Sequence, residues 1–215
     1  MTAPAHGGRP GTRSTLMSRA LRWFEYPAHL AVLNLCWLLA SLPLITSYAA
    51  GIALHSALRA WHEEGENRVA AFFFREWRRV LRGSLPLAAA GLVSLLGLWL
   101  SGSFWLGAPG PLLVFATAAL VPVAIVVTAV HITVFEVAAR RPQAPPRDWV
   151  LAGLRLAVTR PGRCACAVLL CATWGAVLWR LPTLAALWGI SVPALVLHRL
   201  FAGIPTDHPG WSRSA

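Results

Sequence analysis

The feature that most constrains this chain is a set of long apolar runs without charged side chains. The run 112–130 contains no charged residue, and about 20 such residues let an α-helix cross the hydrocarbon core of a bilayer. Of all residues, 57% are hydrophobic and 13% charged, whereas soluble domains carry about 25% charged residues. A water-soluble domain needs polar helix faces, so these runs predict an integral membrane protein.

Five apolar segments follow one another along the chain, at 28–58, 85–106, 112–137, 164–179 and 183–201. Segments two to five each approach the roughly 20 residues of a membrane-spanning helix. The Pro-containing connections at 107–111 and 180–183 are so short that they predict antiparallel neighbours. We therefore expect an all-α, polytopic transmembrane helical bundle of five to six membrane segments at 23–203. A flexible basic tail at 1–22 and a short C-terminal tail at 204–215 flank it.

The arginines predict how the chain is oriented in the membrane. The net charge is +11 and no lysine occurs. The arginines of the longer connections and the C-terminal tail are Arg59, Arg68, Arg75, Arg78, Arg79, Arg82, Arg140, Arg141, Arg147, Arg155, Arg160, Arg163, Arg199 and Arg213. The short connections carry only Arg180. By the positive-inside rule this pattern places the long connections and the C-terminus in the cytoplasm, and it favours a membrane topology over nucleic-acid binding.

The first apolar segment is too long for one span and too short for two complete spans. It contains Pro43 within "SLP", which predicts a helix break. Three arrangements remain open: two short helices broken at "SLP", a re-entrant hairpin, or a single span with the N-terminus outside. The basic N-terminal tail favours a returning segment, with the N-terminus in the cytoplasm.

Residues 67–83 predict an amphipathic helix in the cytoplasmic interface. Its basic face carries Arg75, Arg78, Arg79 and Arg82, and its apolar face carries Phe73, Trp77, Val80 and Leu81. The expected role is anchoring, with the aromatic side chains in the acyl boundary and the guanidinium groups on anionic lipid headgroups. The alternative is that this helix docks a cytoplasmic partner.

The acidic turn before this helix contains Glu63, Glu64 and Glu66. Its spacing differs from that of a Ca²⁺ loop, so we interpret it as a counter-charge to the neighbouring arginines.

Strongly polar residues within the apolar segments are candidates for function because their burial in a membrane is costly. These are Asn34, His131 and Glu136, to which the helix-breaking Pro43 is added. Asn34 predicts a hydrogen bond between helices, and Glu136 an ion pair with Arg140 or Arg141. His131 is interpreted first as a packing residue and second as part of a proton relay.

No catalytic or cofactor-binding pattern is visible in the sequence. Nucleophile and zinc-protease motifs do not occur, and without lysine no P-loop can form. Cys36, Cys164, Cys166 and Cys171 lack the spacing of a zinc site. We therefore expect a protein that is not an enzyme and that holds no metal or cofactor.

Three consecutive stretches resemble the YesL-like family of bacterial integral membrane proteins, also called domain of unknown function 624. They read "NLCWLLASLPLIT", "ALHSALRAWHEEGE" and "FFFREWRRVLRG". The residues that carry the resemblance are Asn34, Ser41, Leu42, Pro43, Thr46, Ala53, Leu54, Gly65, Glu66, Phe73 and Phe74. The resemblance implies a small multi-pass protein of the bacterial plasma membrane that assists ABC-type carbohydrate uptake, with transporter subunits as partners. The alternative function is a small transporter or channel with a polar path near Asn34, Pro43 and His131.

Overall fold

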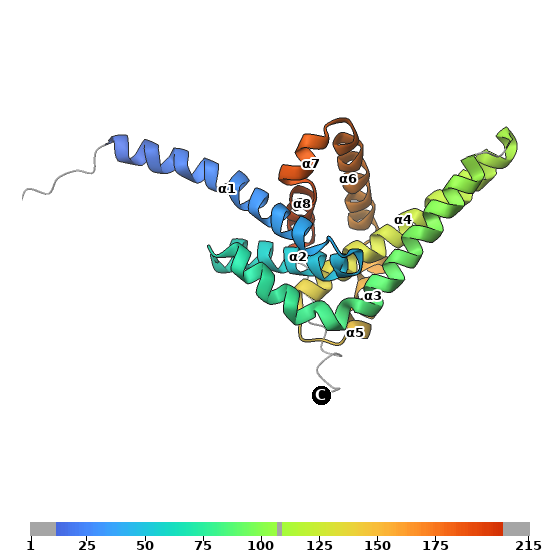
Figure 1. Ribbon diagram of the computed structural model, residues 1–215, viewed down its shortest axis with the longest axis horizontal. Coiled ribbons are helices and arrows are strands. Elements are labelled where there is room, and N and C mark those ends of the chain that lie inside the picture. The colour runs from blue at the N-terminus through green and yellow to red at the C-terminus, as the bar shows by residue number, and fades with distance from the viewer. Residues whose placement is uncertain (1–11, 107–108, 204–215) are drawn as a thin grey trace, which may run out of the picture.

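Helices alone build the part of the chain that the computed structural model describes, residues 12–106 and 109–203, with side chains from residue 26 onward. The helices are α1 (Thr12–Ala40), the 3-10 helix η1 (Leu44–Thr46), α2 (Ser47–Glu64), α3 (Val69–Leu106), α4 (Gly110–Arg140), α5 (Pro146–Thr159), α6 (Pro161–Arg180), α7 (Pro182–Trp188) and α8 (Ser191–Phe201) (Figure 1). The all-α prediction is confirmed for these residues. α1 begins at Thr12, so residues 12–22 of the predicted tail are helical. Residues 1–11 and the predicted C-terminal tail at 204–215 lie outside the described residues.

α2 is the central helix of the fold. Every residue of 48–58 is buried, and many of them are alanine or glycine, which lets neighbouring helices approach closely. At Gly51 a Cβ atom would lie 2.9 Å from the ring of Phe135 on α4. Leu54 and Leu58 of α2 pack in one core cluster with residues of α1, α3 and α8. α2 therefore joins elements that are distant in sequence.

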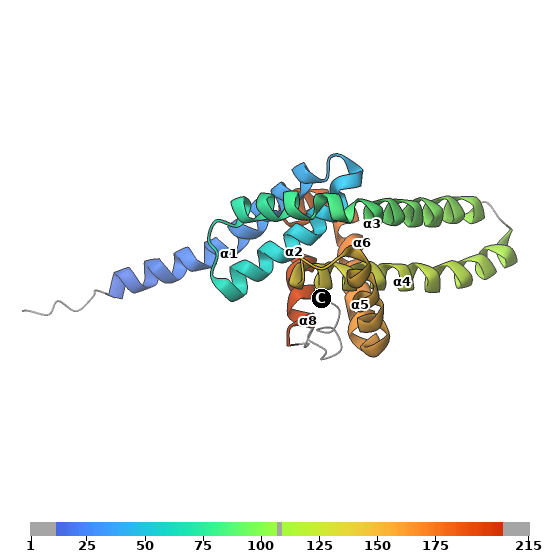
Figure 2. The ribbon, with the colours of Figure 1, turned by 90° about the horizontal axis from the view of Figure 1, so that it is seen from below.

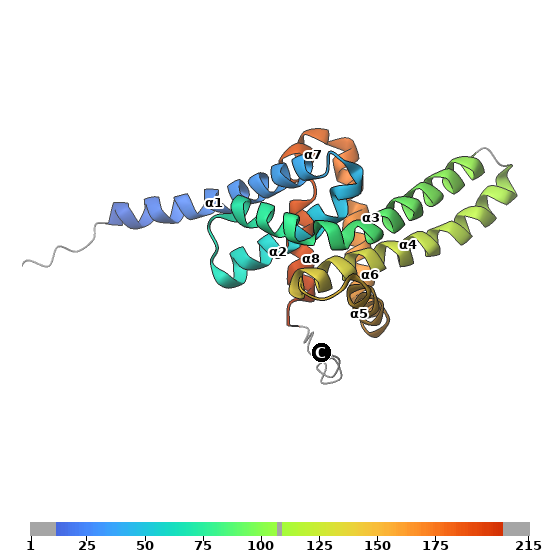
Figure 3. The same ribbon diagram turned by 60° about the horizontal axis from the view of Figure 1, so that its bottom comes forward.

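The first apolar segment breaks at "SLP", as the sequence predicted. α1 ends at Ala40, and η1 and α2 follow Pro43. The Thr46 hydroxyl donates to the carbonyl oxygen of Pro43 at 2.7 Å and stabilises the turn. α2 then runs back toward the side from which α1 comes (Figures 1 and 3). The segment is therefore divided into two α-helices, and the choice among the three arrangements in the membrane stays a prediction.

α3 corrects the prediction of a separate interfacial helix at 67–83. It is one helix of 38 residues that contains Pro86, and Figure 1 shows that it bends between its two halves. A proline inside a helix removes one hydrogen bond and kinks the helix without having to end it. The apolar face of the first half is buried in protein: Phe73 packs against α1 and α2, and Val80 against α2, α4 and α5. Placing the aromatic side chain of Phe73 in the acyl boundary was wrong, because it is buried in protein.

The second half of α3 and the first half of α4 form a hairpin that extends away from the other helices (Figure 2). Large apolar side chains are exposed along it, including Val93, Phe104 and Phe115, at 70–75% of their surface. Exposed apolar side chains on all sides of a helix pair are typical of a lipid-facing membrane hairpin.

Three helices in the described residues are long and apolar enough to span a membrane: α3, α4 and α6. The pair α7 and α8 becomes a fourth candidate if it counts as one span, although it is bent by 59°. The prediction of one continuous helix at 183–201 was wrong, because it breaks between Trp188 and Ser191. The five to six predicted segments exceed these candidates because the apolar part of α1, Tyr26–Ala40, is short and α2 carries charged residues at its end.

α5 is a helix that the sequence interpretation missed. Pro145 is its N-cap, Pro146 is its first residue, and Asp148 lies in its first turn, where a carboxylate is favourable. A Cβ atom at Gly153 would lie 2.7 Å from a methyl carbon of Val134, so α5 packs directly on the backbone of α4. The indole N–H of Trp149 donates to the carbonyl oxygen of Arg141 at 2.8 Å and closes the connection between the two helices.

Candidate functional site

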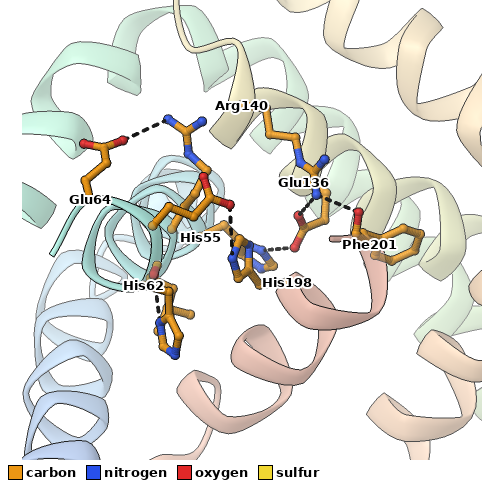
Figure 4. A network of polar contacts seen from close by, with 10 residues as sticks. His55, His62, Glu64, Glu136, Arg140, His198 and Phe201 are labelled. Atoms are coloured by element: carbon orange, nitrogen blue, oxygen red, sulfur yellow. Dashed lines mark hydrogen bonds and ion pairs between the residues drawn. The ribbon is translucent and has the colours of Figure 1, made fainter. Parts of the chain in front are cut away.

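A buried polar network joins α2, α4 and α8 (Figure 4). The Nδ1 atom of His55 lies 2.8 Å from a carboxylate oxygen of Glu136, and both side chains are at least 93% buried. The other carboxylate oxygen of Glu136 lies 3.7 Å from Arg140. Arg140 also donates to the carbonyl oxygen of Phe201, at 2.8 Å. The predicted ion pair of Glu136 with an arginine of its own helix is present, and the histidine from α2 adds a partner that the sequence did not reveal.

A second histidine connects this region to the acidic turn. The Nε2 atom of His198 on α8 lies 3.6 Å from Glu63, which is the last residue but one of α2. The ring of His62 lies 6.2 Å from that of His198, measured between centroids. Burial lowers the pKa of His62, and the nearby positive charge of Arg199 lowers it further. The hydrogen bond to the Leu58 carbonyl and the charge of Glu63 act in the opposite direction.

The three glutamates of the acidic turn face different partners. Glu64 pairs with Arg59 at 3.8 Å, and Glu66 accepts a hydrogen bond from the backbone N–H of Arg68 at 2.7 Å. Gly65 adopts the left-handed conformation, with φ of 71°, that commonly ends a helix. The turn therefore serves as the C-cap of α2, and its carboxylates diverge.

Among the described residues, no group of three or more His, Cys, Asp or Glu side chains is arranged to hold a metal ion. The four cysteines are free thiols, and Cys36 and Cys164 are buried.

The side chain of Asn34 forms hydrogen bonds with the backbone at the break between α7 and α8. Its amide nitrogen donates to the carbonyl oxygens of Ala185 at 3.0 Å and Ala186 at 2.7 Å, and its amide oxygen accepts from the N–H of Ile190 at 3.0 Å. In a continuous helix the N–H of Ile190 would donate to the carbonyl of Ala186. The amide of Asn34 is inserted between these two groups, and side-chain insertion of this kind bends helices. The predicted hydrogen bond of Asn34 between helices is confirmed.

The remaining intramembrane candidates lie in different surroundings. Pro43 is exposed in the turn before η1, whereas Asn34 is buried at the break of α7 and α8. His131 lines a cavity of about 280 Å³ between α2, α3 and α4, and its Nδ1 lies 2.8 Å from the carbonyl oxygen of Val127. Whether His131 is a packing residue or part of a proton relay stays a prediction.

The four arginines of the predicted basic face, Arg75, Arg78, Arg79 and Arg82, are all exposed on the first half of α3. Glu76, which the sequence interpretation overlooked, is 5% exposed among them. It lies 3.1 Å from Arg79 and 4.0 Å from Arg75. A buried carboxylate therefore lies on this face, with Arg79 as its nearer partner.

Comparison with known proteins gives a match to a family model. No curated protein and no solved structure matches the chain. A family model does match, over residues 30–101, which include most of the apolar part of α1, all of α2 and most of α3. Its description reads "Protein of unknown function, DUF624". Residues 30–101 thus contain Asn34, His55, the acidic turn and the arginine face, and this region of the chain matches the DUF624 family model, as its resemblance to the YesL-like proteins predicted.

Proposed function

We propose that this protein is a non-enzymatic, multi-pass component of the bacterial plasma membrane that docks a cytoplasmic partner through the arginine face of α3. The observation that carries the proposal is the arrangement of Arg75, Arg78, Arg79 and Arg82. They are exposed on one side of a half-helix whose other side is buried through Phe73 and Val80. Because the apolar side is occupied by protein, the helix is not needed as a lipid anchor, and its charged side is available for another molecule.

The proposed topology has both termini and the arginine face in the cytoplasm. Two observations on the ends of α2, α4 and α8 support it. Arg140 at the end of α4 donates to Phe201 at the end of α8, and Glu63 near the end of α2 pairs with His198 of α8. The three ends therefore lie together, on the side where the positive-inside rule places the long connections. With α1 and α2 as an outgoing and a returning segment, the chain crosses the membrane six times.

The proposed partner is a subunit of an ABC-type carbohydrate importer. This identity rests on the family resemblance, and the chemistry of the arginine face specifies the contact: a surface rich in carboxylates, because guanidinium groups bind carboxylates in pairs of parallel hydrogen bonds. Energy for uptake comes from the transporter, since this chain has no lysine for a P-loop.

Charge removal from the arginine face tests the proposal. Arg75, Arg78, Arg79 and Arg82 are changed together to glutamine in the tagged full chain, which is cross-linked in its own cells and purified. We expect loss of the transporter subunit from the purified complex and reduced uptake of labelled sugar. A matched variant removes four arginines elsewhere, Arg147, Arg155, Arg160 and Arg199, which are also exposed.

The control variant separates docking from general attraction to anionic lipid headgroups, because both variants lose the same charge. The proposal predicts that only the α3 variant loses the partner. Equal recovery of the subunit and equal uptake with both variants and the unaltered chain would refute it.

The broken pair of α7 and α8 favours a second candidate function, a small carrier, because interrupted helices form substrate sites in many transporters. Asn34, which lies at this break, is then the polar group of the pathway, with His131 and Pro43 farther along the path. Purified protein in liposomes would move a labelled solute without any other subunit. Liposomes that retain every tested sugar equally with and without the protein would exclude this function for those sugars.

A further inference from the structure

A cavity of about 220 Å³ lies at the centre of the fold, where five helices meet. Its wall includes Trp37 of α1, His55 of α2, Phe135 of α4, Cys171 of α6 and Pro193 of α8. Most of the lining is apolar or aromatic. An apolar cavity of about 150 Å³ is large enough to bind benzene, so this one can hold a ring with an additional group.

His55 supplies a polar atom in this apolar wall. Its Nδ1 lies 2.8 Å from Glu136, whose carboxylate also faces Arg140 at 3.7 Å. A carboxylate accepts hydrogen bonds, so the N–H of the imidazole ring lies at Nδ1. In a neutral ring with that tautomer, Nε2 is a hydrogen-bond acceptor. The carboxylate thereby fixes both the orientation of the ring and the role of its second nitrogen, as carboxylate–histidine pairs do in binding sites.

The neighbouring polar side chain Ser47 already has a partner. Its hydroxyl donates to the carbonyl oxygen of Leu44 at 2.6 Å. The ring of Phe135, which also lines the cavity, stacks against that of His55, with centroids 5.9 Å apart, and provides a flat apolar surface beside the imidazole ring. A ligand with a charge would lose its hydration in this cavity without gaining a counter-ion. An uncharged ligand with one donor group matches the wall.

We propose that the central cavity binds a compact, uncharged aromatic or cyclic molecule whose single hydroxyl or N–H group donates a hydrogen bond to Nε2 of His55. This binding site is independent of the arginine face, which lies on the outer surface of α3. Pockets that are apolar with a few oriented polar groups are the usual form of small-molecule sites.

The test uses two probes that differ in one hydroxyl group, 2-naphthol and naphthalene, with the purified full chain in detergent. The first readout is the alkylation rate of Cys171 in a variant whose other cysteines, Cys36, Cys164 and Cys166, are changed to alanine. We expect 2-naphthol to slow alkylation of Cys171 in a saturable manner, at a concentration about fivefold lower than naphthalene requires, because one hydrogen bond contributes about 1 kcal/mol. The second readout is a concentration-dependent rise in melting temperature.

Two variants make the result specific. His55→Phe keeps a ring against Phe135 but removes the acceptor, and it should abolish the preference for 2-naphthol. Because it leaves Glu136 without this partner, it can also impair folding. Cys171→Phe fills the cavity from another helix and leaves the pair of His55 and Glu136 intact; it should abolish the rise in melting temperature with both probes. Equal effects of 2-naphthol and naphthalene, no effect of either, or an undiminished rise with Cys171→Phe would overturn the proposal.

Discussion

Replacement of Asn34 by leucine should destabilise the fold at a point far from Asn34 in sequence. The substitution keeps the approximate size of the side chain and removes its three hydrogen bonds to Ala185, Ala186 and Ile190. Ala185 still accepts from the N–H of Gly189 at 3.1 Å. The carbonyl of Ala186 and the N–H of Ile190 lose the partners that the amide provides.

The magnitude follows from these two backbone groups. A buried polar group that loses its partner costs about 1–3 kcal/mol, whereas hydrogen bonds within membranes average about 0.6 kcal/mol in mutational cycles. Asn34 is 1% exposed, so we expect the free energy of unfolding to fall by about 3 kcal/mol. At about 2–4 °C per kcal/mol for a chain of this size, the melting temperature should fall by about 6–12 °C.

Thiol alkylation in detergent during heating measures this effect, because Cys36 is buried and becomes reactive when the chain unfolds. Amide exchange should also accelerate at Ile190. Leu35→Ala is the control, since Leu35 neighbours Asn34 and is 56% exposed. The reasoning is refuted if Asn34→Leu melts within 2 °C of this control, a threshold of about 1 kcal/mol, and exchange at Ile190 is unchanged.

Three further predictions use the same melting measurement. Gly153→Ala should cost about 1–3 kcal/mol, because its Cβ would lie 2.7 Å from a methyl carbon of α4, whereas Gly162→Ala, with open space around it, should change the melting temperature little. The folded-state pKa of His62 is lowered below 6.5, so the unfolded chain binds this proton more readily, and the free energy of unfolding falls as the pH decreases below 6.5. His62→Gln should flatten this fall of the melting temperature with pH. Identical profiles of melting temperature against pH for the variant and the unaltered chain would contradict the prediction. Trp149→Phe should cost about 1 kcal/mol through the lost bond to the carbonyl of Arg141, and an unchanged melting temperature would show that this bond contributes nothing.

Local sequence patterns were sufficient for the features that depend on neighbouring residues. The apolar runs predicted α4 and α6 within a few residues, and the proline of "SLP" predicted the break after α1. The spacing of Arg75, Arg78, Arg79 and Arg82, at i, i+3, i+4 and i+7, predicted their common exposed face. Each of these features is determined by helical geometry or by backbone chemistry within a few turns.

The features that the sequence did not predict depend on contacts between distant segments. We expected a helix at 67–83 separate from the apolar segment at 85–106, yet one helix, α3, continues through Pro86, because packing against α2 and α4 outweighs the cost of one lost hydrogen bond. The break of α7 and α8 involves Asn34, which is separated from Ile190 by 156 residues. Likewise, His55 and Glu136 are 81 residues apart, and no periodicity in either helix indicates that they meet.

The most direct test of the account is the side of the membrane from which the arginine face can be reached. Arg78→Cys is introduced into a chain whose four natural cysteines are replaced by alanine, with Arg180→Cys in the same background as the reference for the opposite side. We predict that a membrane-impermeant maleimide labels the cysteine at position 78 only in inverted vesicles and the cysteine at position 180 only in intact cells. Labelling of position 78 from outside the cell would contradict the proposed topology and, with it, the docking of a cytoplasmic partner to α3.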